Sequence, residues 1–284
     1  MRLVALLTLT CGLSASACTG NAGPGGTTPA EPNRSASPAA TATPSPSSSD
    51  RPGTATPAAI DADATRALDR MGAYMRSLKA FQVNAVTSRD QVLENGQKVT
   101  FTGAVTLLVS RPDRFRAEVT SDRQQREYLY NGKSFTLWAQ RVNYYATVPA
   151  PPTLAQLGTE LHDKYDIEVP LADLFQWGSE GNTAAAGITA ATDIGPSEVA
   201  GVSCEHFALR QDGVDWQVWI QQGDYPLPRK LVITTTTDAA RPQHTASYTW
   251  NLAPSYNEAS FTFVPPSGVS RIVMSPLAEP QGVN

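Results

Sequence analysis

The sequence is poor in the residues on which catalysis and covalent cross-links depend. Its 284 residues include only three cysteines and three histidines, and His162, His206 and His244 lie far apart along the chain. It contains no HExxH zinc motif, no GxSxG nucleophile elbow and no phosphate-binding loop. We therefore expect no enzymatic activity, no metal site and no cofactor.

Charged residues and long apolar runs are also scarce. Charged residues make up 17% of the chain, and the formal net charge is −4. We do not expect a mildly acidic chain to bind nucleic acid, because phosphates require a basic surface. The apolar run at residues 3–13 has about half of the roughly 20 residues that a transmembrane helix needs. The run is therefore too short to be a stable transmembrane helix.

The same run fits an export signal. It follows Arg2 and leads to Ala15-Ser16-Ala17-Cys18. One positive charge, a short apolar stretch and small residues before a cleavage point are typical of a secretory signal, which we place at residues 1–17. The cysteine after Ala17 resembles a bacterial lipobox, in which the thiol receives a diacylglyceryl group. We expect Cys18 to be a lipid anchor; the alternative is an ordinary signal beside a cysteine.

Residues 18–60 have the composition of a disordered tether. Gly, Ala, Pro, Ser and Thr make up 35 of the 42 residues from 19 to 60, and no aromatic residue is present. Such a segment cannot bury enough apolar surface to offset the entropy lost on ordering. The folded domain, residues 61–284, then contains Cys204 as its single cysteine, so no intrachain disulfide is expected.

The domain opens with a predicted helix and continues with strands. Apolar residues three or four positions apart define the helix, with Asp61 or Asp63 as N-cap: Ala64, Leu68, Met71, Met75 and Leu78. From Val99 to Val109 the period changes to two, as in a strand with one apolar face. Three dipeptides predict tight hairpins: Asn95-Gly96, Asn131-Gly132 and Asp212-Gly213.

Further strands are expected at residues 115–120, 126–130, 134–138, 144–148, 202–210, 214–221, 230–237 and 243–252. Short connections favour antiparallel neighbours. Residues 149–187 interrupt them with two short helices, one capped by Thr153 and one after Pro170. The pattern predicts a mainly β fold with helices, of the α+β class. Taken alone, it favours a solid core beneath the helices.

Two details of the strands concern reactive or aromatic side chains. Cys204 alternates with Val202 and Ala208, which predicts a buried small hydrophobic residue rather than a nucleophile. Trp216 and Trp219 are three positions apart, so at most one of them can face the interior of a regular strand.

Several segments resemble LolA-type periplasmic lipoprotein carriers, in the same order along the chain. They are VSRPDRFR at 109–116, YNGKSFTLW at 130–138, the strand pair between Trp216 and Lys230, and FTFVPPSGV at 261–269. The whole pattern is also similar to a domain-of-unknown-function family of predicted periplasmic proteins. The resemblance spans residues 64–270.

This resemblance implies a half-barrel of about eleven antiparallel strands with a helical lid and an apolar cavity between them. In LolA and in lipoproteins of the LppX and LprG kind, that cavity holds acyl chains. The implied lining residues are Val99, Phe101, Val105, Leu107, Phe115, Leu161, Leu174, Phe175 and Trp216. In LolA an arginine holds the lid through hydrogen bonds to helix-loop carbonyls. Arg111 occupies the matching position; the alternative is a surface arginine at a strand end.

We therefore expect an extracytoplasmic, membrane-anchored lipoprotein, in the periplasm or at the cell surface, that binds a lipid or another hydrophobic small molecule, in keeping with a carrier role. The alternative is a non-enzymatic sensor or scaffold that contacts an envelope protein partner through the same fold. A solvent-filled apolar cavity favours the first hypothesis. A filled core with an exposed apolar patch favours the second.

Overall fold

The computed structural model of the protein describes residues 60–177 and 185–277. Its strands are β1 (Ala80–Val92), β2 (Lys98–Ser110), β3 (Arg114–Ser121), β4 (Gln125–Tyr130), β5 (Ser134–Ala139), β6 (Tyr144–Pro149), β7 (Ala190–Val199), β8 (Val202–Gln211), β9 (Val214–Gln221), β10 (Pro228–Thr235), β11 (Gln243–Asn251) and β12 (Ser270–Arg271). Its α-helices are α1 (Ala62–Ser77), α2 (Leu154–Tyr165) and α3 (Ala172–Trp177). Two short 3-10 helices are η2 (Gln140–Val142) and η3 (Glu258–Phe261).

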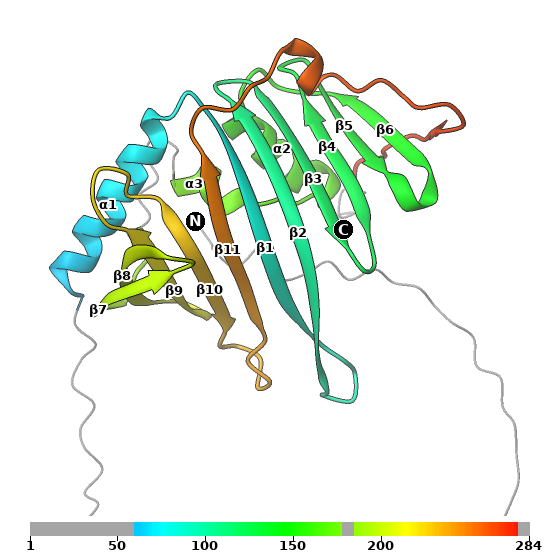
Figure 1. The fold of residues 1–284 in the computed structure, drawn as a ribbon. Coiled ribbons are helices and arrows are strands. Elements are labelled where there is room, and N and C mark those ends of the chain that lie inside the picture. The colour runs from blue at the N-terminus through cyan, green and yellow to red at the C-terminus, as the bar shows by residue number, and fades with distance from the viewer. Residues whose placement is uncertain (1–59, 178–184, 278–284) are drawn as a thin grey trace, which may run out of the picture. The chain divides into compact units, whose positions relative to one another are not determined.

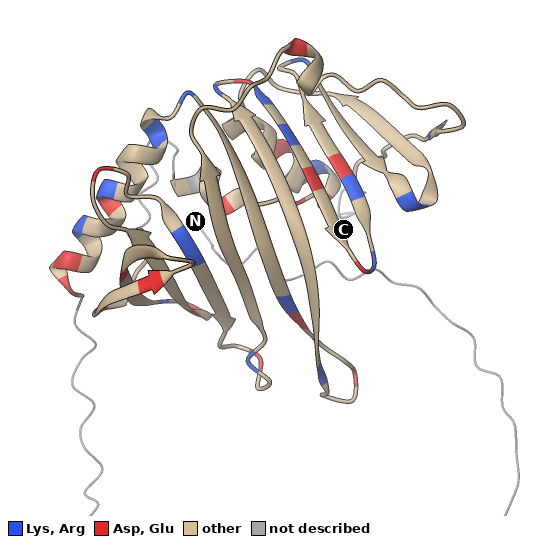
Figure 2. Cartoon of the chain, in the orientation of Figure 1, with Lys and Arg blue, Asp and Glu red and all other residues tan. Residues whose placement is uncertain are grey.

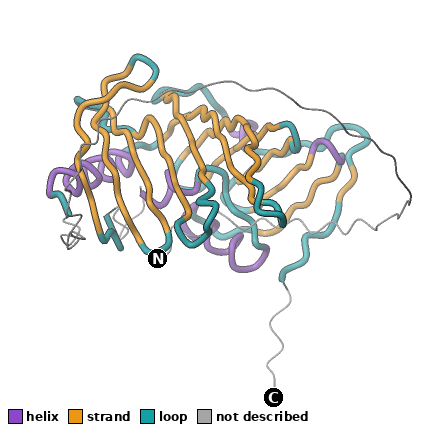
Figure 3. Tube along the Cα trace, turned by 90° about the horizontal axis from the view of Figure 1, so that it is seen from below, coloured by secondary structure: helices purple, strands orange, loops and turns teal. Residues whose placement is uncertain are grey.

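The described strands form a single curved sheet. Their order is β12-β6-β5-β4-β3-β2-β1-β11-β10-β9-β8-β7, so the long strand β1 joins the N-terminal and C-terminal halves through β11 (Figure 1). The helices α1, α2 and α3 pack against the sheet in one shared buried cluster. Figure 3 shows the molecule turned by 90°, with helices in purple and strands in orange. The predicted fold class, a mainly β half-barrel with helices, is confirmed.

The strand count and one pairing differ from the prediction. The sheet has twelve strands rather than about eleven, and β12 runs parallel to β6 with Ser270 opposite Tyr144, so the sheet is mixed. A two-residue strand is too short to show a period of two. The edge strand β7 was also not predicted, because it contains Gly195 and Pro196 beside a bulge, and both residue types are depleted in strands.

Local sequence signals account for the helix and the hairpins. The Asp61 carboxylate accepts a hydrogen bond from the Asp63 amide at 2.7 Å, which caps α1. The predicted turns at Gly96, Gly132 and Gly213 all form, with φ angles of +80°, +84° and +77°, respectively. Such positive φ angles cost glycine little because it has no Cβ.

The core lies between the inner face of the sheet and the three helices. Its largest fully buried side chains are aromatic: Phe81, Phe115, Tyr130, Phe135, Trp177, Phe207 and Trp216. On the outer face, a smaller apolar layer forms where the C-terminal segment crosses β3–β6 and buries Phe261 against Leu129. The sheet therefore has two covered regions, one on each face.

The signal peptide (1–17), the Cys18 anchor and the tether before Ile60 lie outside the described residues. They therefore stay predictions.

Candidate ligand-binding site

The helices α2 and α3, which occupy the place of the expected lid and are called the lid helices below, are attached to the sheet in different ways. The Thr153 hydroxyl caps α2 by accepting from the Gln156 amide at 3.3 Å. The first amide of α2, at Leu154, donates to the Pro112 carbonyl at 3.0 Å, and the Tyr130 hydroxyl donates to the Pro151 carbonyl just before the helix. The start of α2 is therefore tied to the strands by polar contacts. For α3, the packing of its side chains against α1, α2 and the sheet takes this role.

Most of the predicted lining residues meet beneath these helices. Six belong to one buried cluster: Val105, Leu107, Phe115, Leu161, Leu174 and Trp216. Phe175 is half-buried and packs against this cluster, with its ring centroid 6.1 Å from that of Phe115. The fold thus brings residues of α2, α3, β2, β3 and β9 to one place.

Val99 and Phe101 do not belong to this cluster, which corrects the prediction. Both are half-buried, although they share a strand face with Val105. The Arg123 guanidinium lies over the Phe101 ring at 4.2 Å. The end of the β1–β2 hairpin extends beyond the part of the sheet that the helices cover (Figure 1), so these two side chains lack a packing partner from the lid.

The interior beneath the lid is packed, which corrects the implied open cavity. Two pockets on the described part of the chain are lined by other residues. One lies along the outward polar residues of α2, and the other lies on the opposite face of the sheet. The cluster residues themselves are almost entirely buried against one another. A guest would have to displace side chains of α2 or α3 to enter.

Buried polar atoms without partners collect where α3 meets the sheet. Asp173 of α3 is 3% exposed, and its Oδ1 has no hydrogen-bond partner among the described residues. Burial raises the pKa of the Asp173 carboxyl to about 6. On β11, burial also raises the pKa of the Tyr248 hydroxyl well above its usual value, and the charge of Asp173 adds to this effect. These two buried groups therefore lie close enough for the charge of Asp173 to affect the Tyr248 hydroxyl.

Two indoles extend this region. The rings of Trp177 and Trp216 stack with their centroids 6.3 Å apart, and neither Nε1–H group donates to a described residue. A buried donor or acceptor without a partner costs about 1–3 kcal/mol. The seam between α3 and strands β9 and β11 is thus less well satisfied than the rest of the core.

The predicted latch of Arg111 is not formed. Its Nε and Nη2 are buried and make no hydrogen bond to the described residues, and burial lowers the pKa of the guanidinium. The Pro151 carbonyl before α2 accepts instead from Tyr130. The backbone of the same turn contacts α2 in a different way, because the Pro112 carbonyl accepts a hydrogen bond from the Leu154 amide.

Asp173 and Tyr248 were not among the predicted site residues. The signal for Asp173 was a single acid within the otherwise apolar stretch LADLFQW at 171–177. Nothing in the alternation of β11 distinguishes Tyr248 from an ordinary core tyrosine. The predicted burial of Cys204 is confirmed, and burial raises the pKa of its thiol.

Residues 60–177 and 185–277 contain neither a membrane-spanning helix nor a metal-binding cluster. None of their helices has the length and apolar character needed to span a membrane. No group of three or more His, Cys, Asp or Glu side chains among them is arranged to hold a metal ion.

Comparisons with known proteins agree with the resemblance expected from the sequence. A family described as predicted periplasmic protein (DUF2092) matches residues 64–275. Among solved structures, an uncharacterized conserved protein from Thermus thermophilus has 11% identity and a TM-score of 0.44, covering 74% of this chain and 99% of that one. The lipoprotein LppX from Mycobacterium tuberculosis has 12% identity and a TM-score of 0.43, with 69% and 100% covered.

A LolA superfamily protein from Nitrosomonas europaea has 10% identity and a TM-score of 0.33, covering 70% of this chain and 97% of that one. No curated protein sequence matches the chain.

Proposed function

We propose that this chain, which belongs to the family of predicted periplasmic proteins DUF2092, binds a hydrophobic molecule between its curved sheet and the helices α2 and α3. Family membership supports an extracytoplasmic location. We further propose that Cys18 anchors the protein to a membrane and that its role is not enzymatic.

The observation that carries this proposal is the unsatisfied seam beneath α3. Asp173, Trp177 and Trp216 all bury polar atoms that have no hydrogen-bond partner among the described residues, in an otherwise apolar interior. When α3 lifts, these atoms gain hydrogen bonds to water or to a guest, which offsets part of the cost of opening. An amphiphile with an apolar body and a polar end fits such a site, because its body replaces the core contacts while its end satisfies the seam.

The size of the helices supports the same mechanism. α2 has 12 residues and α3 has 6, so both depend on tertiary contacts for their stability. Residues on them that face the sheet, such as Leu161 and Phe175, would contact the guest.

The experiment measures binding of an apolar fluorescent probe by the purified mature protein, together with mass spectrometry of co-purified lipid. Wild-type protein should bind the probe. The double variant Leu161→Asp/Phe175→Asp should lose binding, because charge in an apolar site is strongly unfavourable. The control is Ala155→Asp/Thr159→Asp on the exposed side of α2, which should bind normally. Since Leu161 is fully buried, the single variant Phe175→Asp at a half-buried position tests the same point with less risk to folding.

A second candidate function, a scaffold for an envelope protein, has its own supporting observation. The interior is filled, and the C-terminal segment exposes Val264 by 78% and Val273 by 86%. Apolar side chains that are exposed on one segment favour this function if they form a contiguous patch, because such patches are typical of protein contacts. If wild-type protein binds no probe and yields no lipid, the carrier hypothesis fails and the scaffold remains.

A further inference from the structure

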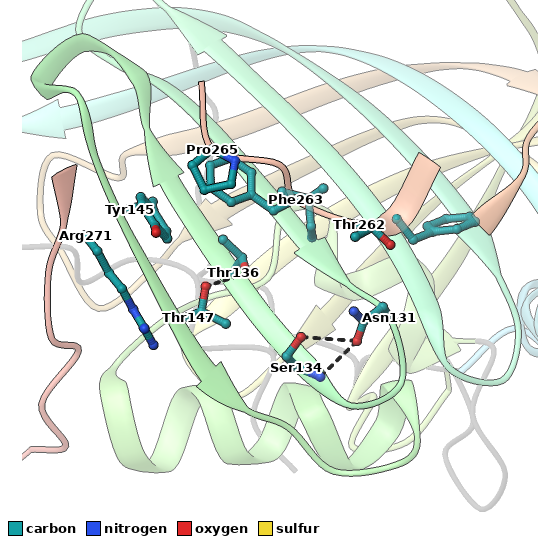
Figure 4. A pocket seen from close by; sticks show the side chains of 11 residues that line it. Asn131, Ser134, Thr136, Tyr145, Thr147, Thr262, Phe263, Pro265 and Arg271 are labelled. Carbon is teal, nitrogen blue, oxygen red and sulfur yellow. Dashed lines mark hydrogen bonds between the residues drawn. The ribbon is translucent and has the colours of Figure 1, made fainter. Parts of the chain in front are cut away.

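A separate pocket lies on the outer face of the sheet, away from the helices. It has a volume of about 290 Å³ and is roofed by the C-terminal segment around Phe263 and Pro265 (Figure 4). Its floor is formed by Leu129, Thr136 and Thr147, which alternate along β4–β6 with the core residues of the opposite face. We call it the outer pocket. None of the residues expected to line the interior contributes to it.

The floor of the outer pocket offers unused hydrogen-bonding groups. The hydroxyls of Thr136 and Thr147 are 2.8 Å apart. Because one hydroxyl donates to the other, one hydrogen of the pair remains for a guest. The Asn131 Oδ1 accepts from the Ser134 amide at 2.9 Å and from its hydroxyl at 3.2 Å. These bonds fix the Asn131 side chain while leaving the two hydrogens of its amide nitrogen free of any described partner.

One wall of the outer pocket is aromatic. The Phe263 ring packs against Tyr145 with centroids 5.0 Å apart and against Trp138 at 5.5 Å. Three rings that support one another make a rigid apolar surface beside the polar floor. Such a combination suits a molecule with one apolar face and several hydroxyl groups.

The charge at the outer pocket has one sign. β5 and β6 contain no charged residue, and Arg271 is the charged side chain among the lining residues. It enters from β12 beside Tyr145 and extends along β6 toward Thr147 (Figure 4). Arg271 forms no ion pair with a described residue. Arg116 on β3, in contrast, pairs with Glu118 on the same strand and with Glu127 on β4. Figure 2 shows charges of both signs on these two strands.

We propose that the outer pocket binds a small anionic molecule rich in hydroxyl groups, of the size of one acidic sugar. Its carboxylate would pair with the Arg271 guanidinium, whose planar donors match a carboxylate. Its hydroxyls would bond to Asn131 and to the pair of threonines, and the apolar face of its ring would lie on Phe263 and Tyr145. The volume of about 290 Å³ lies just below the range of about 300–1,000 Å³ for small-molecule pockets, and the polar floor does not suit a lipid chain.

The test is a titration of the full mature protein with glucuronate, followed by NMR or calorimetry, with glucose as the neutral comparison. Glucuronate should bind saturably and at least about tenfold more tightly than glucose, because the pair with Arg271 is charge-assisted. Arg271→Gln should abolish that preference. Thr136→Val should weaken the binding of both sugars, since it removes a hydroxyl group from the floor of the pocket at nearly constant side-chain volume.

The control is Lys133→Gln, an exposed cation on the nearby β4–β5 turn that does not line the outer pocket. It should leave binding unchanged, which separates a specific contact from general attraction of charge. The proposal is overturned if binding does not saturate at glucuronate concentrations of up to roughly tens of millimolar. It is also overturned if Arg271→Gln and Lys133→Gln change the affinity for glucuronate equally. Variants of the α2–α3 lid should leave this binding intact, so its outcome is independent of the hydrophobic ligand.

Discussion

Replacing Asp173 with asparagine removes an ionisable group from the seam between α3 and the sheet. Burial raises the pKa of the carboxyl from 3.8 to about 6 in the folded protein, and the negative charge of Glu168 contributes to this rise. A shift of about two pH units corresponds to ~3 kcal/mol of folding free energy. Because the folded pKa is raised, the stability due to the neutral carboxyl is fully present below the unfolded pKa of 3.8. It is lost as the pH rises through about 6.

The stability of the variant relative to the wild type should therefore be greater at about pH 7.5 than at about pH 3.5. We expect the difference in unfolding free energy to grow by about 1–3 kcal/mol between these values. Urea unfolding of both proteins across this range measures it. Asp163→Asn, at an exposed position of α2, is the matched control and should show no comparable change.

A stability difference between Asp173→Asn and the wild type that does not vary across this pH range would refute this reasoning. It would mean that the carboxyl reaches water or a partner when charged. Hydrogen exchange adds a local measurement. If ionisation destabilises the seam, the amides of α3 should exchange faster at the higher pH than the intrinsic rate change explains, and those of α1 should not.

Three further predictions concern anchoring and packing. Cys18→Ser should release the protein from membrane fractions, because a hydroxyl cannot form the thioether; unchanged partitioning would exclude the lipid anchor. Phe115→Ala should cost about 3–5 kcal/mol of unfolding free energy, whereas Phe101→Ala should cost less than about 2 kcal/mol, since its ring is only half-buried. Gly72→Ala should destabilise by about 1–2 kcal/mol, because its Cβ would lie 2.9 Å from a carbonyl oxygen of α3. Gly158→Ala, with open space around it, should instead stabilise α2 by about 0.5–1 kcal/mol; equal effects of the two glycine changes would contradict the close packing of α1 and α3.

The parts of the fold that depend on local rules could be predicted from the sequence. The Asn-Gly and Asp-Gly turns, the cap at Thr153 and the strand periodicity each depend on a few neighbouring residues. The spacing of Trp216 and Trp219 also gave a correct prediction. Trp216 faces the core, whereas Trp219 lies on the other face, where it stacks with His206 at 3.9 Å.

The parts that depend on distant segments could not be predicted. Alternation places Phe101 on the apolar face, but it does not show how far the helices extend over that face. Arg111 matches a motif, yet its buried Nε and Nη2 make no hydrogen bond to the described residues, and the Pro151 carbonyl before α2 accepts from Tyr130 of another strand. The pairing of β12 with β6 joins residues that are distant in the sequence, such as Ser270 and Tyr144. In addition, a strand of two residues is too short to show a period of two.

The contacts of the two lid helices favour α3 rather than α2 as the part that opens first. Lifting the start of α2 breaks the Thr153 cap and its bonds to Pro112 and from Tyr130, each of which contributes about 0.5–1.5 kcal/mol. Lifting α3 breaks apolar contacts as well, but it exposes the Asp173 Oδ1 and the Trp177 Nε1, which have no hydrogen-bond partner to lose among the described residues. Above a pH of about 6 the charge on Asp173 lowers the cost further. Opening at α3, with α2 held at its start, is therefore the movement that this seam favours for admitting a guest.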